Sequence, residues 1–131
     1  MSNIERRRSP RQAVLDSFSL FVVVPRKGVH RLHVADLSQL GIGFDLDIEG
    51  EPQEDFPVAT GENLELHLYL NQSLYIPLSL LVARIDTSAP LRRVGAEFTQ
   101  RESQGFRAFE SFFQMLLAVS KTARFSDPPP V

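Results

Sequence analysis

Apolar and polar residues alternate along several stretches of this 131-residue chain, and this period of two limits the possible folds more than any other feature. The clearest case is residues 64–70, where leucine occupies every even position and Glu65, His67 and Tyr69 lie between. A strand with one buried face shows this alternation, because successive side chains point to opposite faces. Leucine favours helices, but the period indicates a strand here.

The same alternation predicts six strands. They cover residues 18–24, 29–35, 42–46, 64–70, 74–85 and 94–98. Gly28 can supply the positive φ of a tight reversal, so the first two strands are expected to form a hairpin. Pro77 lacks an N–H group and is therefore expected at an edge or a bulge. Short strands joined by hairpins and short loops indicate an antiparallel barrel or sandwich.

The period changes after the sixth strand and predicts a helix from about residue 102 to 120. Its apolar stripe consists of Phe106, Phe109, Phe113, Leu116 and Leu117. Thr99 and Glu102 fit a capping box, in which both side chains satisfy N–H groups at the start of a helix. The stripe is expected to cover one open end of the barrel, and the alternative is that part of it docks a partner.

Length and composition fit one globular domain that needs neither disulfides nor a structural metal. The chain has no cysteine, which excludes disulfides, zinc ribbons and thiol catalysis. Its longest uncharged apolar stretch, residues 74–83, is shorter than the roughly 18 residues of a membrane helix. The arginine-rich start is not followed by a leucine-rich signal sequence, so a cytoplasmic protein is expected.

No pattern indicates an enzyme. His30, His33 and His67 lie in strand patterns without the spacing of a metal site. Ser38 is not part of a G-x-S-x-G elbow, and the chain has no glycine-rich phosphate loop of the Walker or Rossmann type. A binding function is therefore favoured over catalysis, with no cofactor and no metal.

An arginine run opens the chain. Arg7 and Arg11 form R-x-x-x-R, with Arg6 and Arg8 beside them, whereas residues 49–55 carry four acids and no cation. The planar guanidinium donates paired hydrogen bonds to phosphate or to the O6/N7 edge of guanine. By itself, the run could equally be a solvated tail or a nonspecific nucleic-acid contact.

A second pattern, D-x-S-x-x-G, lies between two predicted strands and comprises Asp36, Ser38 and Gly41. An ionised carboxylate only accepts hydrogen bonds, which matches the N1–H and N2–H₂ donors of guanine. Taken alone, the hexapeptide is more simply an Asx turn. A single hairpin separates Arg11 from Asp36, so both patterns can meet at one rim of the barrel.

Together, the two motifs resemble the signature of the PilZ domain family, bacterial receptors of the second messenger cyclic di-GMP. Residues 7–11 supply R-x-x-x-R, residues 36–41 supply D-x-S-x-x-G, and residues 94–98 resemble the family's V-G-x-x-F strand. The resemblance covers about residues 5 to 98. It implies a six-stranded antiparallel β-barrel with a C-terminal α-helix. Residues 1–12 would then be an arginine arm, residues 13–122 the domain, and residues 123–131 a disordered proline-rich tail.

The resemblance also implies the ligand contacts. Arg7 and Arg11 would bind guanine edges and phosphates, while Asp36 and Ser38 would hold a guanine and Gly41 would allow its approach. Members with an arginine immediately before R-x-x-x-R tend to bind two intercalated ligand molecules.

Arg6 occupies that position, so two ligands per chain are expected, with Arg8 as a further contact. Val82 is the expected counterpart of a bulkier residue that lies beneath a base in some members, although its smaller side chain would stack less well.

The implied function is a switch. Binding of a dianion would relieve the repulsion among the arginines, clamp the arm across the barrel rim and change a surface for an unidentified partner protein. The main alternative is a small barrel that binds nucleic acid through the arginine arm. The slightly negative net charge and the presence of only two tyrosines argue against it. A protein-interaction module that no longer binds ligand is the other alternative. No membrane or nucleic-acid partner is expected.

Overall fold

The computed structural model describes residues 15, 17–28, 30–47, 56–87, 91–122 and 124. Several predictions fall outside these residues: the arginine arm with Arg6, Arg7, Arg8 and Arg11, the acidic segment 49–55, and the proline-rich end of the chain.

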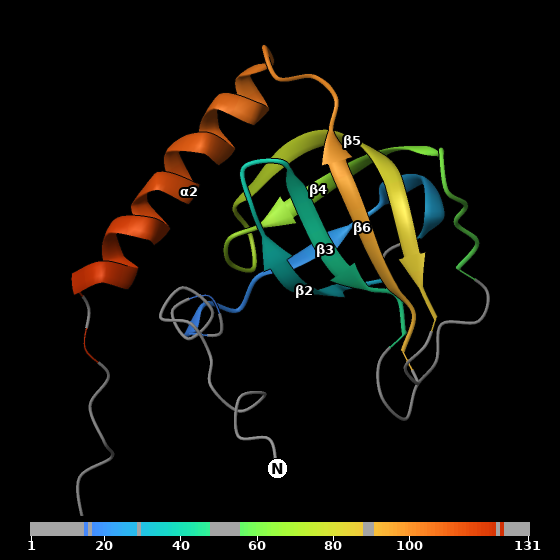
Figure 1. Ribbon diagram of the computed structural model, residues 1–131, viewed down its shortest axis with the longest axis horizontal. Helices are drawn as coiled ribbons and strands as arrows, with labels where there is room; N and C mark the ends of the chain where they lie inside the picture. Colours follow the sequence, from blue (N-terminus) through green and yellow to red (C-terminus); the bar gives the residue numbers. More distant parts are fainter. Residues whose placement is uncertain are drawn as a thin grey trace, which may run out of the picture.

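Six strands form one closed antiparallel barrel, as predicted (Figure 1). The strands are β1 (Phe21–Val23), β2 (Leu32–Leu37), β3 (Gly41–Asp45), β4 (Asn63–Tyr69), β5 (Tyr75–Asp86) and β6 (Arg93–Phe98). Their order around the barrel is β1-β2-β3-β6-β5-β4, and β4 pairs with β1 to complete the ring. The sequence left a sandwich open as the alternative, and the β1–β4 pairing excludes it.

The apolar residues at every second strand position fill the barrel interior. In β4, Leu64, Leu66 and Leu68 are at most 3% exposed, while the residues between them face outward. Pro77 pairs with His67 of β4 on one side, and the pairing of β5 with β6 begins only at Leu80. Pro77 thus lies in a part of β5 that has a strand partner on one side only, where a residue without an N–H group is tolerated.

The first hairpin differs from the prediction in its limits. β1 comprises only Phe21–Val23, and Phe18 before it packs edge-on against Phe112, with ring centroids 6.2 Å apart. A short 3-10 helix, η2 (Pro25–Lys27), follows, and Gly28 has the expected positive φ of 111°. At the far end, β2 continues through Asp36 to Leu37, where a turn had been expected.

The helix α2 (Gln104–Thr122) packs against β5 beside the barrel (Figure 1). Phe106, Phe109, Phe113 and Leu116 are buried in the same cluster as the barrel interior. The rings of Phe106 and Phe109 lie 5.1 and 4.6 Å from that of Phe98, at the end of β6. This part of the predicted stripe therefore faces the core.

The predicted capping box is wrong. The side chain of Ser103 caps α2, since its Oγ accepts a hydrogen bond of 3.0 Å from the N–H of Phe106. Thr99 lies earlier on the path from the barrel, where its N–H donates to the carbonyl oxygen of Ser79 in β5. The chain needs residues 99–103 to travel from the end of β6 to the helix, which moves the cap four positions along.

We expect Ser103→Ala to lower the free energy of unfolding by about 0.5–2 kcal/mol, because it removes the hydroxyl that satisfies the Phe106 N–H. The matched variant Thr99→Ala should stay within about 0.5 kcal/mol of the original protein. Urea denaturation followed by circular dichroism measures both. A larger loss in Thr99→Ala than in Ser103→Ala would restore the predicted box.

Candidate functional site

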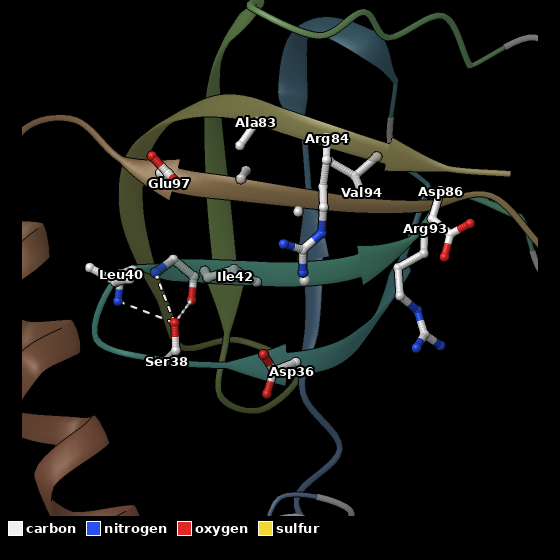
Figure 2. Close-up of a pocket in the computed structure, with 14 residues that line it drawn as sticks. Asp36, Ser38, Leu40, Ile42, Ala83, Arg84, Asp86, Arg93, Val94 and Glu97 are labelled. Atoms are coloured by element: carbon white, nitrogen blue, oxygen red, sulfur yellow. Dashed lines mark hydrogen bonds between the residues drawn. The ribbon is translucent and has the colours of Figure 1, made fainter.

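The D-x-S-x-x-G motif forms the turn from β2 to β3, and Ser38 closes that turn. Its Oγ accepts hydrogen bonds of 3.2 Å from the N–H groups of both Leu40 and Gly41. The backbone N–H of Ser38 donates to the carbonyl oxygen of Gly41 at 3.0 Å. The hydroxyl therefore shapes the loop and presents it at the surface (Figure 2).

The turn borders a pocket of about 420 Å³ on the outer wall of the barrel (Figure 2). Its lining comes from β2, β3, β6 and the second half of β5. Gly43 of β3 and Gly95 of β6 are direct partners across the sheet, so neither strand raises a side chain at that point. The wall is consequently hollowed where a flat ligand could approach the backbone.

Gly41 is required by packing rather than by a positive φ. A Cβ atom at this position would lie 1.8 Å from the carbonyl oxygen of Ala96, which is backbone and cannot yield easily. β3 and β6 can therefore pair at this register only with glycine at position 41, which links the third residue of the motif to the shape of the pocket.

Two β-bulges aim charged side chains at the pocket. The register shifts between Val34 and Asp36 in β2, and again between Val82 and Arg84 in β5. Strict alternation would turn both charged residues inward, because Val34 and Val82 face the core. Each extra residue reverses the phase, and Asp36 and Arg84 both line the pocket instead.

The two arginines of the pocket have different environments. Arg93 forms a two-point ion pair with the buried Asp45, with Nε–Oδ1 and Nη2–Oδ2 distances of 2.7 and 3.3 Å. This hydrogen bonding raises the pKa of Arg93 further above its ordinary value. His33 lies on the same carboxylate, with Nδ1 3.2 Å from Oδ2. The charge of Arg93 is therefore already compensated.

Arg84 extends from β5 across β6 toward β3 (Figure 2). Its side chain occupies the space above Gly95, where an added Cβ would lie 3.1–3.2 Å from three of its atoms. Within the described part of the chain, no hydrogen bond or ion pair fixes its guanidinium. Arg84 is thus a cation that a ligand can recruit. The alternation of the sequence places Arg84 inside the barrel, so the sequence did not predict it as a pocket residue. Only the position of the bulge shows that it faces outward.

The structure places Asp36, Ser38 and Gly41, the three residues that define the motif, in the lining of this pocket. Val82 is a correction: it is 1% exposed and points into the barrel, so it cannot lie beneath a bound base. Val82 continues the inward series of Leu78 and Leu80 in β5, and the outward positions that follow it belong to Ala83 and Arg84.

The charge balance of the pocket is acidic. Asp36, Asp86 and Glu97 supply three carboxylates against the two arginines, one of which is held by Asp45. The described wall can thus accept hydrogen bonds from a polar ligand, but it offers one uncommitted cation. Among the described residues there is also no group of His, Asp or Glu that could hold a metal ion. No described helix is long and apolar enough to span a membrane.

These features define a small antiparallel barrel with a polar binding pocket on one wall. The PilZ domain matches residues 5–114 of the chain, which therefore belongs to the PilZ domain family. No curated protein matches the sequence.

Solved structures of similar fold include two of K. pneumonia MrkH. The MrkH complex with c-di-GMP has a TM-score of 0.63 and 15% identity, over 82% of this chain and 50% of that one. The apo state has a TM-score of 0.60 and 16% identity, over 79% and 48%. The Bacillus subtilis inhibitor of motility, MotI/DgrA, has a TM-score of 0.52 and 19% identity, over 77% and 47%. This chain spans about half the length of these proteins.

We expect Gly41→Ala to lower the free energy of unfolding by about 1–3 kcal/mol or more, because the new methyl group collides with the Ala96 carbonyl. Gly43→Ala is the matched control, since its Cβ would meet nothing closer than 3.5 Å. Urea denaturation compares the two variants. Equal stabilities would show that β3 and β6 do not need this close approach.

Proposed function

We propose that this chain is a non-enzymatic receptor for cyclic di-GMP and that the pocket beside β3 holds a guanine of the ligand. The observation that carries the proposal is the meeting of Asp36, Ser38 and Gly41 at one cavity of about 420 Å³. Membership of the PilZ domain family supports it. So does the similarity in fold to K. pneumonia MrkH, whose structure is described as a complex with c-di-GMP.

The chemistry of Asp36 suits a guanine edge. Its carboxylate, exposed at the end of β2, can accept hydrogen bonds from N1–H and N2–H₂ together. Ser38 keeps the turn in the shape that borders the cavity, and its hydroxyl can still turn toward a ligand atom. Gly43 leaves the floor low beside Arg84, whose side chain covers Gly95, so a planar base has room next to the guanidinium.

The acidic balance of the pocket indicates that the cations come largely from the arginine run. A cyclic dinucleotide carries two phosphate charges, and the described wall offers Arg84 as its one uncommitted cation. We assign Arg7 and Arg11 to the phosphates and guanine edges, with Arg8 beside them. Arg84 can stack its planar guanidinium on a base or donate two hydrogen bonds to it.

Arg6 bears on the number of ligands. It stands immediately before R-x-x-x-R and adds a fourth arginine within six residues. Two intercalated ligands would carry four phosphate charges, which equals the number of arginines at positions 6, 7, 8 and 11. We therefore assign two ligand molecules to each chain.

Regulation follows from the division of the site between the arm and the barrel wall. Ligand binding would hold residues 1–12 against the pocket rim and so alter a surface that a partner protein in the cytoplasm recognises. In this proposal the arm is the part that moves on binding.

We expect Arg7→Ala, Arg11→Ala and Asp36→Ala each to weaken cyclic di-GMP binding by about 30-fold or more. Truncation of a charge that is hydrogen-bonded in a complex costs about 2–5 kcal/mol, and about 1.4 kcal/mol corresponds to tenfold. Isothermal titration calorimetry measures this. Arg107→Ala, an exposed arginine on α2, is the matched control and should bind as the original protein does.

The same titration separates the parts of the proposal. No binding by the original protein would refute the receptor function, and original affinity in Arg7→Ala, Arg11→Ala or Asp36→Ala would refute the site. One ligand per original chain would refute only the role of Arg6. If two bind, Arg6→Ala should reduce the stoichiometry toward one.

We expect saturating cyclic di-GMP to slow amide hydrogen exchange in residues 1–12, because the arm would then be held against the barrel rim. Exchange in β4, which contributes no residue to the pocket, should not change and serves as the internal reference. Mass spectrometry measures the exchange. If residues 1–12 exchange at the same rate with and without ligand, the arm is not part of a switch.

A further inference from the structure

A continuous row of planar side chains lies on the outside of the barrel, away from the pocket. Arg31 lies over the ring of Phe21 at 4.8 Å, and Phe21 stacks on Tyr69 with centroids 4.7 Å apart. Tyr69 contacts Tyr75 at 5.1 Å, and Tyr75 stacks on His67 at 4.1 Å. We call these five residues the aromatic row.

The strand register builds this row. Phe21, Tyr69 and Tyr75 are successive partners across β1, β4 and β5, and all three occupy outward positions. The pocket lies on β2, β3, β6 and the second half of β5, whereas the row lies on β1, β4 and the start of β5. The barrel interior therefore separates the two surfaces.

The row is open to solvent at one end. Tyr75 is 42% exposed, and the neighbouring Leu74 is 56% exposed. Arg31 supplies a positive charge at the other end, where its only interaction with the described residues is with the Phe21 ring. Packed aromatic rings with tyrosine hydroxyls and one arginine are typical of protein-binding surfaces.

Surfaces of this composition suit proline-rich segments. A polyproline II segment is already extended, so it loses little entropy on docking against aromatic rings. A carboxylate next to the prolines would complement Arg31. The sequence contains consecutive prolines at one place, Asp127-Pro128-Pro129-Pro130, where an aspartate directly precedes them.

We propose that the aromatic row is the docking site for segment 127–130 of this protein. In polyproline II conformation, the three steps from Asp127 to Pro130 cover about 9 Å. The two steps from Phe21 through Tyr69 to Tyr75 are 4.7 and 5.1 Å. The prolines can thus lie along the rings while Asp127 faces Arg31. This inference does not depend on the ligand of the pocket.

The test uses tyrosine as its reporter. The chain has two tyrosines and no tryptophan, and both tyrosines belong to the row. The full chain, labelled with ¹³C in its tyrosine rings, is compared by NMR with a variant carrying Pro128→Ser, Pro129→Ser and Pro130→Ser. We expect the ring resonances to differ between the two. A peptide of residues 124–131, added to the variant, should shift them back toward the original positions in a saturable way.

Matched controls define the site. A peptide with serines in place of its three prolines should leave the resonances unmoved, and Arg31→Gln should weaken peptide binding by up to about fivefold, as expected for an exposed ion pair. Met115→Ser, an exposed apolar residue on α2, should not affect binding. Identical resonances in the original chain and the serine variant, with no response to the peptide, would overturn the proposal. A response to oligothymidylate in place of the peptide would also overturn it, in favour of a nucleic-acid surface.

Discussion

The closure of the barrel by the pairing of β1 with β4 is the constraint on which the rest of the structure depends. A closed sheet has no free edge, so each strand residue faces either the interior or the outside. The interior is filled by apolar side chains and is extended by Phe106 and Phe109 of α2, which contact Phe98. The outside is thereby divided into two walls, one with the glycine-lined pocket and one with the aromatic row. Because the same strands carry both faces, the packing of the core fixes the geometry of each wall.

The pocket depends on the two places where the alternation is interrupted. Without the bulges, the carboxylate of Asp36 and the guanidinium of Arg84 would point into a core whose residues are almost fully buried. Burial of unpaired charges is costly, so the bulges are what make charged residues compatible with these strands. They also place the two opposite charges on either side of the Gly43–Gly95 pair. Backbone irregularity therefore creates the site, and the regular remainder of the barrel holds it in place.

Much of the fold could be predicted because it follows from local periodicity. The leucines of β4, the helical spacing of Phe106 to Leu116 and the positive φ of Gly28 all agree with the structure. Predictions failed where distant packing decided the outcome. The cap moved from Thr99 to Ser103 because the chain must first travel from β6 to α2. Val82 was assigned to the ligand by the family resemblance alone, although the alternation of Leu78, Leu80 and Val82 places it inside the barrel. Arg84 and the aromatic row were missed because both depend on the register between strands.

The near-neutral net charge of −2 results from segments of opposite sign in the sequence. The pocket wall carries three carboxylates and one uncommitted arginine, whereas residues 6–11 carry four arginines. If both segments must contact one anionic ligand, the observed affinity equals the intrinsic affinity reduced by the fraction of molecules in which the arm is in place. Ligand binding and arm position are then linked, and any interaction that holds the arm away from the rim lowers the affinity for the ligand. A site built wholly from the rigid barrel wall would lack this dependence, so the division of charge between arm and wall is itself what would make the receptor adjustable.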